Sequence, residues 1–446
     1  MAVSEWRPSR LGDLVEIKHG WPFKSEHFHE DLRGRPIVLS VGNFRYTGGF
    51  RLAETSVKEY RDGYPKEYEL APSDILLIMT CQTAGGEILG IPARVPDDGR
   101  VYLHNQRLGK VLIRDGADVD SGFLYWLFLW QDFNRELVTS ASGTKILHTA
   151  PSRIGAFRFE LPPKGEQRAI AHILGTLDDK IDLNRRVNET LEAMARALFR
   201  SWFVDFDPVR AKAEGRDPGL PKPLADLFPD SFEDSALGEI PKEWCVGRFG
   251  DVVEQLRDQE NPLSSPEALF HHFSLPAFDE GQSPKAEYGE SIKSQKSRVP
   301  TGVVLLSKLN PEIERVWLVD VRPSERAVCS TEFLVLRARS PFTRSFVYCL
   351  ARSPLFRQQI EGLVTGTSKS HQRAQVESIL NLAVVVPTSS IVAAFDRSAD
   401  GLLVRSLACR RESRTLAALR DALLPKLISG ELRVNDAERF ISEGMA

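Results

Sequence analysis

Apolar residues recur at alternating steps of four and three through two long segments of the chain. A stripe this narrow is typical of a helix that packs against one partner helix. The pattern therefore predicts two helices that pair with each other, each on the order of 55 Å long at ~1.5 Å per residue. The stripe of the first comprises Ile170, Leu174, Leu177, Ile181, Leu191, Leu198 and Trp202, and that of the second includes Phe395, Leu402, Leu416 and Leu423.

Polar residues interrupt the first stripe near its middle. Asn184 and Asn188 fall at positions that face the partner helix. Polar residues at such positions tend to fix register and pairing at some cost in stability. The second stripe is weaker because small residues stand beside the larger ones, and Pro425 is expected to disturb its last turn.

Each helical segment follows a segment with the pattern of a mixed α and β domain. Short apolar runs bounded by turn residues predict strands at Ile75–Met79, Leu108–Ile113, Val303–Leu306 and Phe333–Leu336. Apolar residues at helical spacing predict one helix over Asp118–Val138 and its counterpart over Ser345–Leu363.

The second half of the chain repeats the first. Trp6–Glu16 returns as Trp244–Glu254, and the echo continues at a nearly fixed offset, with His148 matched to His371. Only two copies are present, so the pattern indicates a duplication rather than a solenoid. The fold class we expect is α+β, with two mixed domains in a pseudo-twofold repeat, separated by two long antiparallel coiled-coil helices. The predicted divisions are 1–163 and 244–388 for the two globular domains, 164–213 for the central spacer helix, 214–243 for an extended Pro/Gly-rich linker, 389–432 for the C-terminal spacer helix and 433–446 for a tail.

Composition sets limits on class and compartment. Of the 446 residues, 42% are hydrophobic and 27% are charged, which is ordinary for a soluble protein. A net charge of −3 gives no global support to nucleic-acid binding, so any basic surface must be local. No apolar run reaches the ~20 residues of a membrane span. The first residues lack a charged-then-apolar pattern, so we expect no export signal. The five cysteines include no C-x-x-C pair, which argues against a disulfide framework or zinc site and indicates a cytoplasmic location.

Catalytic motifs are missing from the sequence. Gly362–Ser370 has the wrong Gly-to-Lys spacing for a phosphate loop, and the nine histidines form no metal-ligand cluster. We therefore expect a protein that positions other molecules, with no catalytic residues and no metal of its own. Three classes stay open on the residues alone: a DNA-binding protein, a scaffold that binds proteins through two modules, and an enzyme whose motif is not recognised.

The central part of the chain resembles a known family. Pro162–Asp182 is similar to the central conserved region of the specificity subunits of Type I restriction–modification systems, and so are Leu198–Pro208 and Phe232–Pro241. The closing segment Leu424–Leu432 fits as well. The resemblance is specific in the helical and linker segments and weak in the globular domains, which are the variable, target-recognising domains of that family.

The resemblance implies a function for the whole chain. Each globular domain would read one half of a split, asymmetric site in double-stranded DNA, and the paired helices would fix the gap between the halves. Two methyltransferase subunits would dock on the chain and supply adenine N6 methylation with S-adenosylmethionine. Motor-nuclease subunits would join and use ATP and Mg²⁺. The chain itself would bind no cofactor.

Candidate DNA contacts lie in loops between the predicted elements. Base edges are read by Arg, Lys, Asn, Gln, Ser or Thr, and glycine allows close approach of the backbone. The competing interpretation of any such loop is a solvated turn. The candidates in the first domain are Lys24, Arg45, Asn105, Gln106, Arg107, Gly143, Thr144, Lys145 and His148. Those in the second are Gly366, Thr367, Ser368, Lys369, Ser370, His371, Gln372 and Arg373, with Lys293, Lys296 and Arg298 as a phosphate-contacting stripe.

Large aromatic residues gather at the end of the first predicted helix. The position of Trp202 in the stripe favours a structural role, whereas Phe203 and Phe206 lie off the stripe. We therefore expect Phe203 or Phe206 to be available for docking a partner subunit.

Overall fold

The computed structural model divides the chain into two compact units. It describes residues 6–52, 56–83, 85–143, 145–364, 372–434 and 436. Unit one comprises Met1–Lys180 and Leu416–Ala446, and unit two comprises Ile181–Thr415. We call the globular part of unit one, from β1 (Arg7–Arg10) to β13 (Arg158–Leu161), the first head. The globular part of unit two, from β16 (Cys245–Arg248) to β26 (Ala383–Val386), is the second head.

Each head is built on a four-stranded antiparallel sheet with the same strand order. In the first head the order is β2-β11-β7-β9, and in the second it is β17-β25-β22-β23. The central strands β7 and β22 are buried along their whole length, as their continuous apolar sequences predict. The strand bounds are β2 Val15–His19, β7 Ile75–Ile78, β9 Pro92–Arg94, β11 Leu108–Ile113, β17 Val253–Leu256, β22 Val303–Ser307, β23 Val316–Leu318 and β25 Phe333–Ala338.

A second, five-stranded sheet completes each head. Its order is β3-β5-β4-β10-β6 in the first head and β18-β21-β24-β19-β20 in the second. In each sheet one central pair is parallel, β4 with β10 and β19 with β24, so the two heads share this feature as well. The strand bounds are β3 Phe28–His29, β4 Ile37–Leu39, β5 Glu59–Tyr60, β6 Glu69–Leu70, β10 Tyr102–His104, β18 Gln259–Glu260, β19 Leu269–Phe273, β20 Lys285–Tyr288, β21 Lys296–Arg298 and β24 Arg326–Cys329.

Short elements close the heads. β1 pairs with β13 and β16 pairs with β26, so that each head begins and ends on one antiparallel pair. In the first head β8 (Thr80–Cys81) also pairs with β12 (Leu147–His148). The short helices are α1 Leu11–Leu14, α4 Pro151–Ala156, α8 Phe249–Val252, α9 Leu275–Asp279 and α12 Val376–Leu380, with single 3₁₀ turns at Ser25–His27, Val41–Asn43, Lys66–Tyr68, Pro262–Ser264 and Gly289–Ser291.

The helix predicted in each head is in fact two helices. In the first head α2 (Ser121–Leu129) and α3 (Gln131–Ser140) are separated by Trp130, whose backbone is extended. In the second head α10 (Arg344–Ala351) and α11 (Pro354–Glu361) are separated at Ser353. Ser353 precedes a proline, and a residue before proline is driven out of the helical region by steric contact with the proline ring. The prediction of one continuous helix was wrong in both heads.

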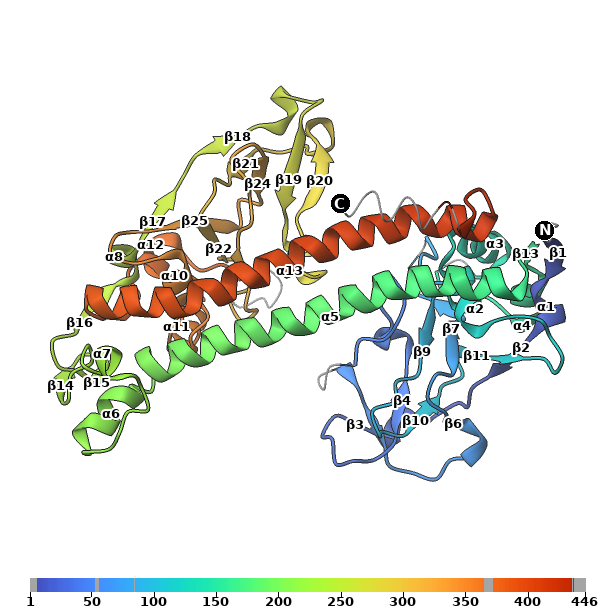
Figure 1. Ribbon diagram of the computed structural model, residues 1–446, viewed down its shortest axis with the longest axis horizontal. Helices are drawn as coiled ribbons and strands as arrows, with labels where there is room; N and C mark the ends of the chain where they lie inside the picture. The colour runs from blue at the N-terminus through green and yellow to red at the C-terminus, as the bar shows by residue number, and fades with distance from the viewer. Residues whose placement is uncertain are drawn as a thin grey trace. The chain divides into compact units, whose positions relative to one another are not determined.

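Two long helices run through both units. These are α5 (Lys164–Phe203) and α13 (Ser389–Ser429), and α13 continues past Pro425, which was expected to disturb its last turn. In unit one, Asp178 of α5 pairs with Arg420 of α13. In unit two, Asn184 donates to Glu412 at 2.9 Å, and rings near the start of α13 lie beside the end of α5. The helices are therefore antiparallel, and the fold is α+β with two mixed heads (Figure 1).

Each head packs on the helix pair of its own unit through its first helix. In unit one, the start of α2 approaches α5 so closely that a Cβ at Gly122 would lie 2.9 Å from the Cβ of Ala171. In unit two, Phe346 of α10 lies 5.3 Å from Phe199 of α5, between ring centroids. The same helix of the duplicated fold thus makes the contact in both units.

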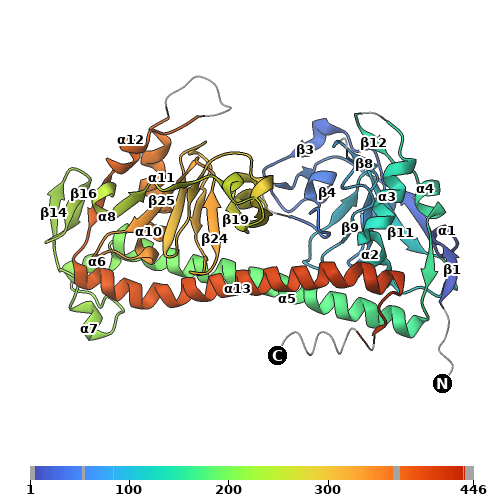
Figure 2. The same cartoon turned by 90° about the horizontal axis from the view of Figure 1, so that it is seen from above.

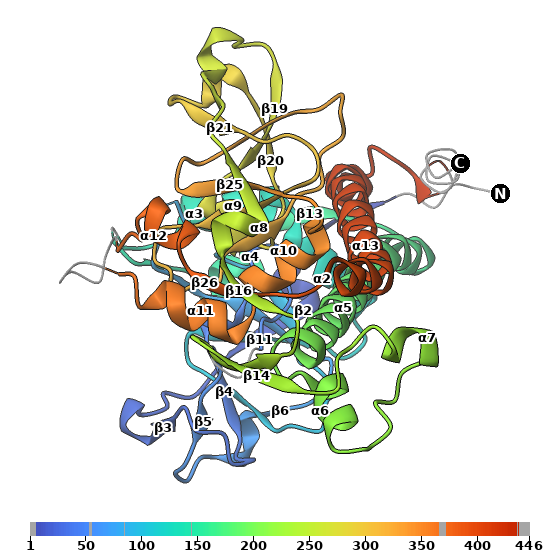
Figure 3. The same ribbon diagram turned by 90° about the vertical axis from the view of Figure 1, so that its left-hand side faces the viewer.

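The Pro/Gly-rich segment between the repeats is folded. It contains α7 (Lys222–Ala225) and a hairpin of β14 (Phe232–Ser235) and β15 (Gly238–Pro241). The separate helix α6 (Asp207–Ala213) precedes it, so the central spacer helix ends at Phe203 and the predicted single helix over 164–213 was too long. These elements lie beside the C-terminal end of α5 (Figures 1 and 3). Phe228 and Ile240 are buried in the core of unit two, with Trp202 and Trp244. The prediction of an extended connector was wrong, because these apolar side chains bind the segment to the core. Among the helices described, none has the length and apolar character needed to cross a membrane.

Candidate nucleic-acid interface

A rigid turn joins β10 to β11 in the first head. His104, the last residue of β10, is buried, and its Nε2 lies 2.9 Å from the carbonyl oxygen of Leu108. Burial lowers the pKa of His104 to about 4, so the imidazole is neutral and Nε2 donates to this carbonyl. The backbone N–H of Gln106 donates to the carbonyl of Trp21 at 3.0 Å. The turn therefore presents Gln106 and Arg107, both exposed, from a fixed backbone.

A groove of about 700 Å³ opens beside this turn. Aromatic rings and polar side chains both line it, which suits contact with flat, polar-edged groups. The lining includes Phe23, Phe28, Phe44, Tyr46, Ser40, Asn43, Lys58, Gln82, Thr83, Asn105, Gln106 and Arg107. The groove thus brings the predicted Asn105, Gln106 and Arg107 together.

Two further predicted residues stand next to the lining of the groove. Lys24 is exposed, and its chain neighbours Phe23 and Ser25 line the groove. Arg45 is half-buried, and its chain neighbours Phe44 and Tyr46 line the groove as well. Sequence reasoning missed Gln82, Tyr46 and Lys58. Gln82 is a polar residue that directly follows the buried β7–β8 segment. Its position after a predicted strand was the sequence signal that could have identified it.

The loop before β12 lies next to the groove. His148 of β12 faces Thr80 of β8, with 3.1 Å between His148 Nδ1 and Thr80 Oγ1. The next residues after β8, Gln82 and Thr83, line the groove. Lys145 is exposed, and Thr144 lies outside the described residues. Figure 2 shows β8 and β12 on the side of the first head away from α5 and α13.

The second head has an equivalent strand end. In the first head the N–H of Met79 donates to the carbonyl of Arg107 at 3.0 Å, and in the second the N–H of Lys308 donates to the carbonyl of Glu332 at 3.0 Å. Both acceptors directly precede a matched strand, β11 or β25. Glu332 therefore occupies the position of Arg107.

The returning strand can be matched in the same way. Thr80 and Leu309 directly follow the two donors just described. Thr80 pairs with His148, and Leu309 pairs with Arg373 in an antiparallel bridge. Arg373 is therefore the counterpart of His148. The match of His148 with His371 predicted from the repeat was wrong by two positions.

Arg373 and Glu332 form an ion pair across this strand end. Arg373 Nη2 lies 2.7 Å from Glu332 Oε1, and Arg373 Nε lies 3.1 Å from Oε2. The side chain of Arg373 is 56% exposed, whereas that of Glu332 is 19% exposed. In the first head, by contrast, Arg107 has no acidic partner within the described ranges. The equivalent strand ends thus carry different charges.

The other predicted contacts of the second head are scattered. Gln372 accepts a backbone hydrogen bond from Asn310 at 2.8 Å. Six of the candidates lie outside the described residues, namely Gly366, Thr367, Ser368, Lys369, Ser370 and His371.

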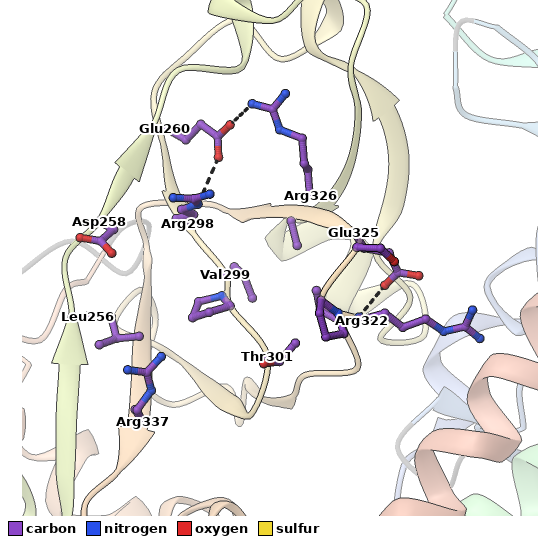
Figure 4. A pocket seen from close by; sticks show the side chains of 15 residues that line it. Leu256, Asp258, Glu260, Arg298, Val299, Thr301, Arg322, Glu325, Arg326 and Arg337 are labelled. Atoms are coloured by element: carbon purple, nitrogen blue, oxygen red, sulfur yellow. Dashed lines mark hydrogen bonds and ion pairs between the residues drawn. The ribbon is translucent and has the colours of Figure 1, made fainter.

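The predicted phosphate-contacting stripe is not one exposed surface. Lys293 and Arg298 are exposed, but Lys296 is half-buried, and burial lowers the pKa of its ammonium group. Arg298 Nε lies 3.7 Å from Glu260, which also binds Arg326. These three residues line a pocket of about 390 Å³ (Figure 4). Since Lys296 is half-buried and Glu260 offsets part of the local positive charge, the stripe is a weaker candidate than the strand ends.

Comparison with known proteins shows which family this chain resembles. A family model described as the Type I restriction modification DNA specificity domain matches residues 3–193. The chain is 26% identical over 340 residues to the Type I restriction enzyme MjaIX specificity subunit of Methanocaldococcus jannaschii, covering 74% of this chain and 73% of that protein. It is 23% identical to the HindI specificity subunit of Haemophilus influenzae, covering 70% and 77%. The chain is thus similar to the specificity subunits of Type I restriction enzymes over most of its length.

The fold is similar to that of a solved structure. A crystal structure of a Type I restriction–modification S subunit from M. genitalium matches with a TM-score of 0.57 and 13% identity, covering 95% of this chain and 96% of that one. At this identity the match concerns the fold alone.

The long helices of this chain bury more than a narrow seam. Of the predicted seam, Ile181, Leu191, Leu198 and Leu402 are half-buried, whereas Ile170, Leu174, Leu177, Trp202, Phe395, Leu416 and Leu423 are buried. Phe199, Leu403 and Leu407 are also buried but fall outside the predicted stripe. The stripe was too narrow because α5 packs on α10 as well as on α13, as the contact between Phe199 and Phe346 shows.

Phe203 and Phe206 are not presented to a partner subunit. Their exposed fractions are 6% and 7%, and both belong to the core of unit two. The ring of Phe203 lies 5.3 Å from that of Phe395, and the ring of Phe206 lies 5.8 Å from that of Trp244, between centroids. The docking prediction is corrected by this packing. Phe203 packs on α13 through Phe395, and Phe206 packs on the hairpin through Phe232 of β14, which the stripe did not anticipate.

No group of three or more His, Cys, Asp and Glu side chains that could hold a metal ion occurs within the ranges given above.

Proposed function

We propose that this chain is a specificity subunit that reads a bipartite, asymmetric site in double-stranded DNA, with one half-site read by each head. The observation that carries the proposal is the pair of matched strand ends. The backbone hydrogen bonds at Arg107 and Glu332 are the same, whereas the side chains differ in charge. A duplicated frame with different polar groups at one position suits the reading of two different half-sites.

The first head would use the groove beside the β10–β11 turn. Gln106 and Arg107 supply donors for base edges or phosphates. The other candidates beside this groove are Lys24, Arg45, Lys145 and His148. In the second head, Gln372 and Arg373 would act at the equivalent strand end. Lys293, Lys296 and Arg298 would contribute at most phosphate contacts, since Glu260 offsets part of their charge.

The long helices would set the distance between the half-sites. The α5 helix has 40 residues, so it is about 60 Å long at ~1.5 Å per residue. Half-sites on one face of the duplex lie about 34 Å apart per helical turn. A helix of this length bridges that spacing, which suits a ruler for a fixed, unread gap.

The chain would act without chemistry of its own. Two methyltransferase subunits would bring S-adenosylmethionine and methylate adenine N6, and motor-nuclease subunits would use ATP and Mg²⁺. This chain would bind none of these cofactors and would recruit the subunits that do. With the Phe203 and Phe206 rings buried, the recruiting surface is to be sought elsewhere on the molecule.

Mapping of N6-methyladenine tests the proposal. Cells that carry this chain and its methyltransferase are compared with cells that lack only this chain. The expected result is a split motif with a fixed gap that disappears in the deletion strain. An unchanged methylation pattern, with the methyltransferase present and active, would reject DNA specificity and favour a protein-binding scaffold.

A further inference from the structure

The strand end of the second head holds an arginine in one orientation. Glu332 contacts Nε and Nη2 of Arg373, which together form one edge of the planar guanidinium group. An arginine has five N–H donors in a fixed fork. The other edge, formed by Nη1 and the second hydrogen of Nη2, has no acceptor among the described residues. Since the side chain is 56% exposed, this second edge faces solvent.

Glu332 is itself held in place. Its backbone N–H donates to Ser330 Oγ at 3.3 Å, and its carbonyl accepts from Lys308. Its carboxylate is only 19% exposed, so it approaches Arg373 from the protein side. An exposed arginine loses side-chain entropy when it is fixed, and a bidentate partner fixes it in advance.

The pair suits a base edge better than a phosphate. Phosphate contacts depend on net positive charge, and the carboxylate of Glu332 cancels most of the charge of Arg373. Guanine presents two neutral acceptors, O6 and N7, in the major groove, and arginine binds both at once. Two parallel N–H donors on the free edge of Arg373 match that pattern.

We propose, on the basis of the DNA-reading function above, that Arg373 is a specificity-determining residue that reads a guanine in one half-site, and that Glu332 is its positioning residue. In the first head Arg107 occupies the position of Glu332, and His148 occupies the position of Arg373. The arginine of the first head therefore precedes β11, and it has no acidic partner among the described residues. The two heads therefore select different bases at corresponding positions of the two half-sites.

The test uses the complex of this chain with its methyltransferase subunits and a DNA library with both half-sites randomised. The variants are Arg373→Lys, which keeps the charge but loses the bidentate fork, and Glu332→Gln, which keeps the size but weakens the pair. Methylated sequences are recovered and compared with those of the wild type. Arg107→Lys, the same change at the equivalent strand end of the first head, is the matched control.

We expect both second-head variants to lower the preference for guanine at one position of one half-site by about 5- to 150-fold, the size of one bidentate contact. The other half-site and the gap should stay unchanged, and Arg107→Lys should leave the Arg373 half-site unchanged. A motif identical to that of the wild type, or a loss of methylation equal at all sequences, would overturn the inference and leave the proposed function standing. If the wild-type complex selects no sequence at all, the proposed function fails and the inference fails with it.

Discussion

The phenol of Tyr348 on α10 donates a hydrogen bond to Glu192 of α5 at 2.9 Å. Arg352 also donates to this carboxylate, at 2.7 Å, and Arg410 of α13 contacts its other oxygen. Burial alone would raise the pKa of Glu192, but Arg410 and Arg352 outweigh it and the pKa is lowered. One carboxylate thus joins the second head to both long helices.

Replacement of Glu192 by Ala should destabilise unit two strongly. The change leaves Arg352 and Arg410 without their buried partner, and breaking a buried ion pair in this way costs about 3–5 kcal/mol. Urea unfolding measures the loss. Glu189→Ala, at an exposed position of the same helix, should change stability by less than about 0.5 kcal/mol. Equal effects of the two substitutions would show that the buried network contributes nothing specific.

Replacement of Phe203 by Ala should act on folding rather than on docking. The ring is buried against Phe395 and Trp244, and a Phe→Ala change in a core costs about 3–5 kcal/mol. Unfolding free energy and affinity for the methyltransferase subunit are measured on the same preparation. Met194→Ala, at a 51% exposed side chain of α5, is the control for stability. Weaker subunit binding by the Phe203 variant with unchanged stability would restore a docking role for this ring.

The first head should lose stability in acid through His104. Burial, assisted by Lys110 and Lys18 and opposed by Asp74, lowers the pKa of His104 to about 4. Between pH ~6.5 and ~4 the unfolded chain binds a proton at this imidazole while the folded chain does not, so stability falls as pH falls through this window. The full loss is about 3 kcal/mol at 1.36 kcal/mol per pH unit.

The variant His104→Gln tests this pH dependence. Glutamine retains an N–H donor for the Leu108 carbonyl but does not titrate. Hydrogen exchange in the first head, measured at pH 7 and pH 4.5, should show a smaller acid-induced loss of protection in the variant. His148→Gln, at an exposed histidine, should retain the wild-type response. An identical acid response of the His104 variant would place the proton uptake at other groups.

Replacement of Gly20 by Ala should disturb only the half-site read by the first head. An added Cβ would lie 2.2 Å from the carbonyl oxygen of Asn105, so the β10–β11 turn must move. Gly63→Ala is a suitable control because its Cβ would meet nothing within 4 Å. Methylation mapping should show one half-site lost or relaxed and the other retained. Equal loss of both half-sites would indicate that the turn supports the whole fold rather than one reading surface.

The sequence predicted the elements whose signal is local. The strands β7, β11, β22 and β25 follow from short apolar runs, and the long helices follow from their apolar stripe. The break at Ser353 had a visible signal in the following proline, whereas the extended backbone of Trp130 had none. The folding of the linker depends on the tertiary contacts of Phe228 and Ile240 in the core of unit two. The local sequence pattern does not specify such contacts.

The site was predictable only in part. Asn105, Gln106 and Arg107 stand between two predicted strands, so the turn was evident. The equivalence of His148 and Arg373 was not, because the second loop is longer by two residues: Gly143 to His148 spans five positions and Gly366 to Arg373 spans seven. An alignment of the two repeats at Gly143 and Gly366 does not account for the two additional residues of the second loop. The strand register shows which residues are equivalent after the loop.

The hydrogen bonds from Met79 to Arg107 in one head and from Lys308 to Glu332 in the other join main-chain atoms only. A substitution at Arg107 or Glu332 therefore leaves these hydrogen bonds intact, even when it reverses the charge of the side chain. If each head reads one half-site as proposed, single substitutions at these positions give one head a new target preference over evolutionary time. The other head, and the fold that carries both, can stay as they were.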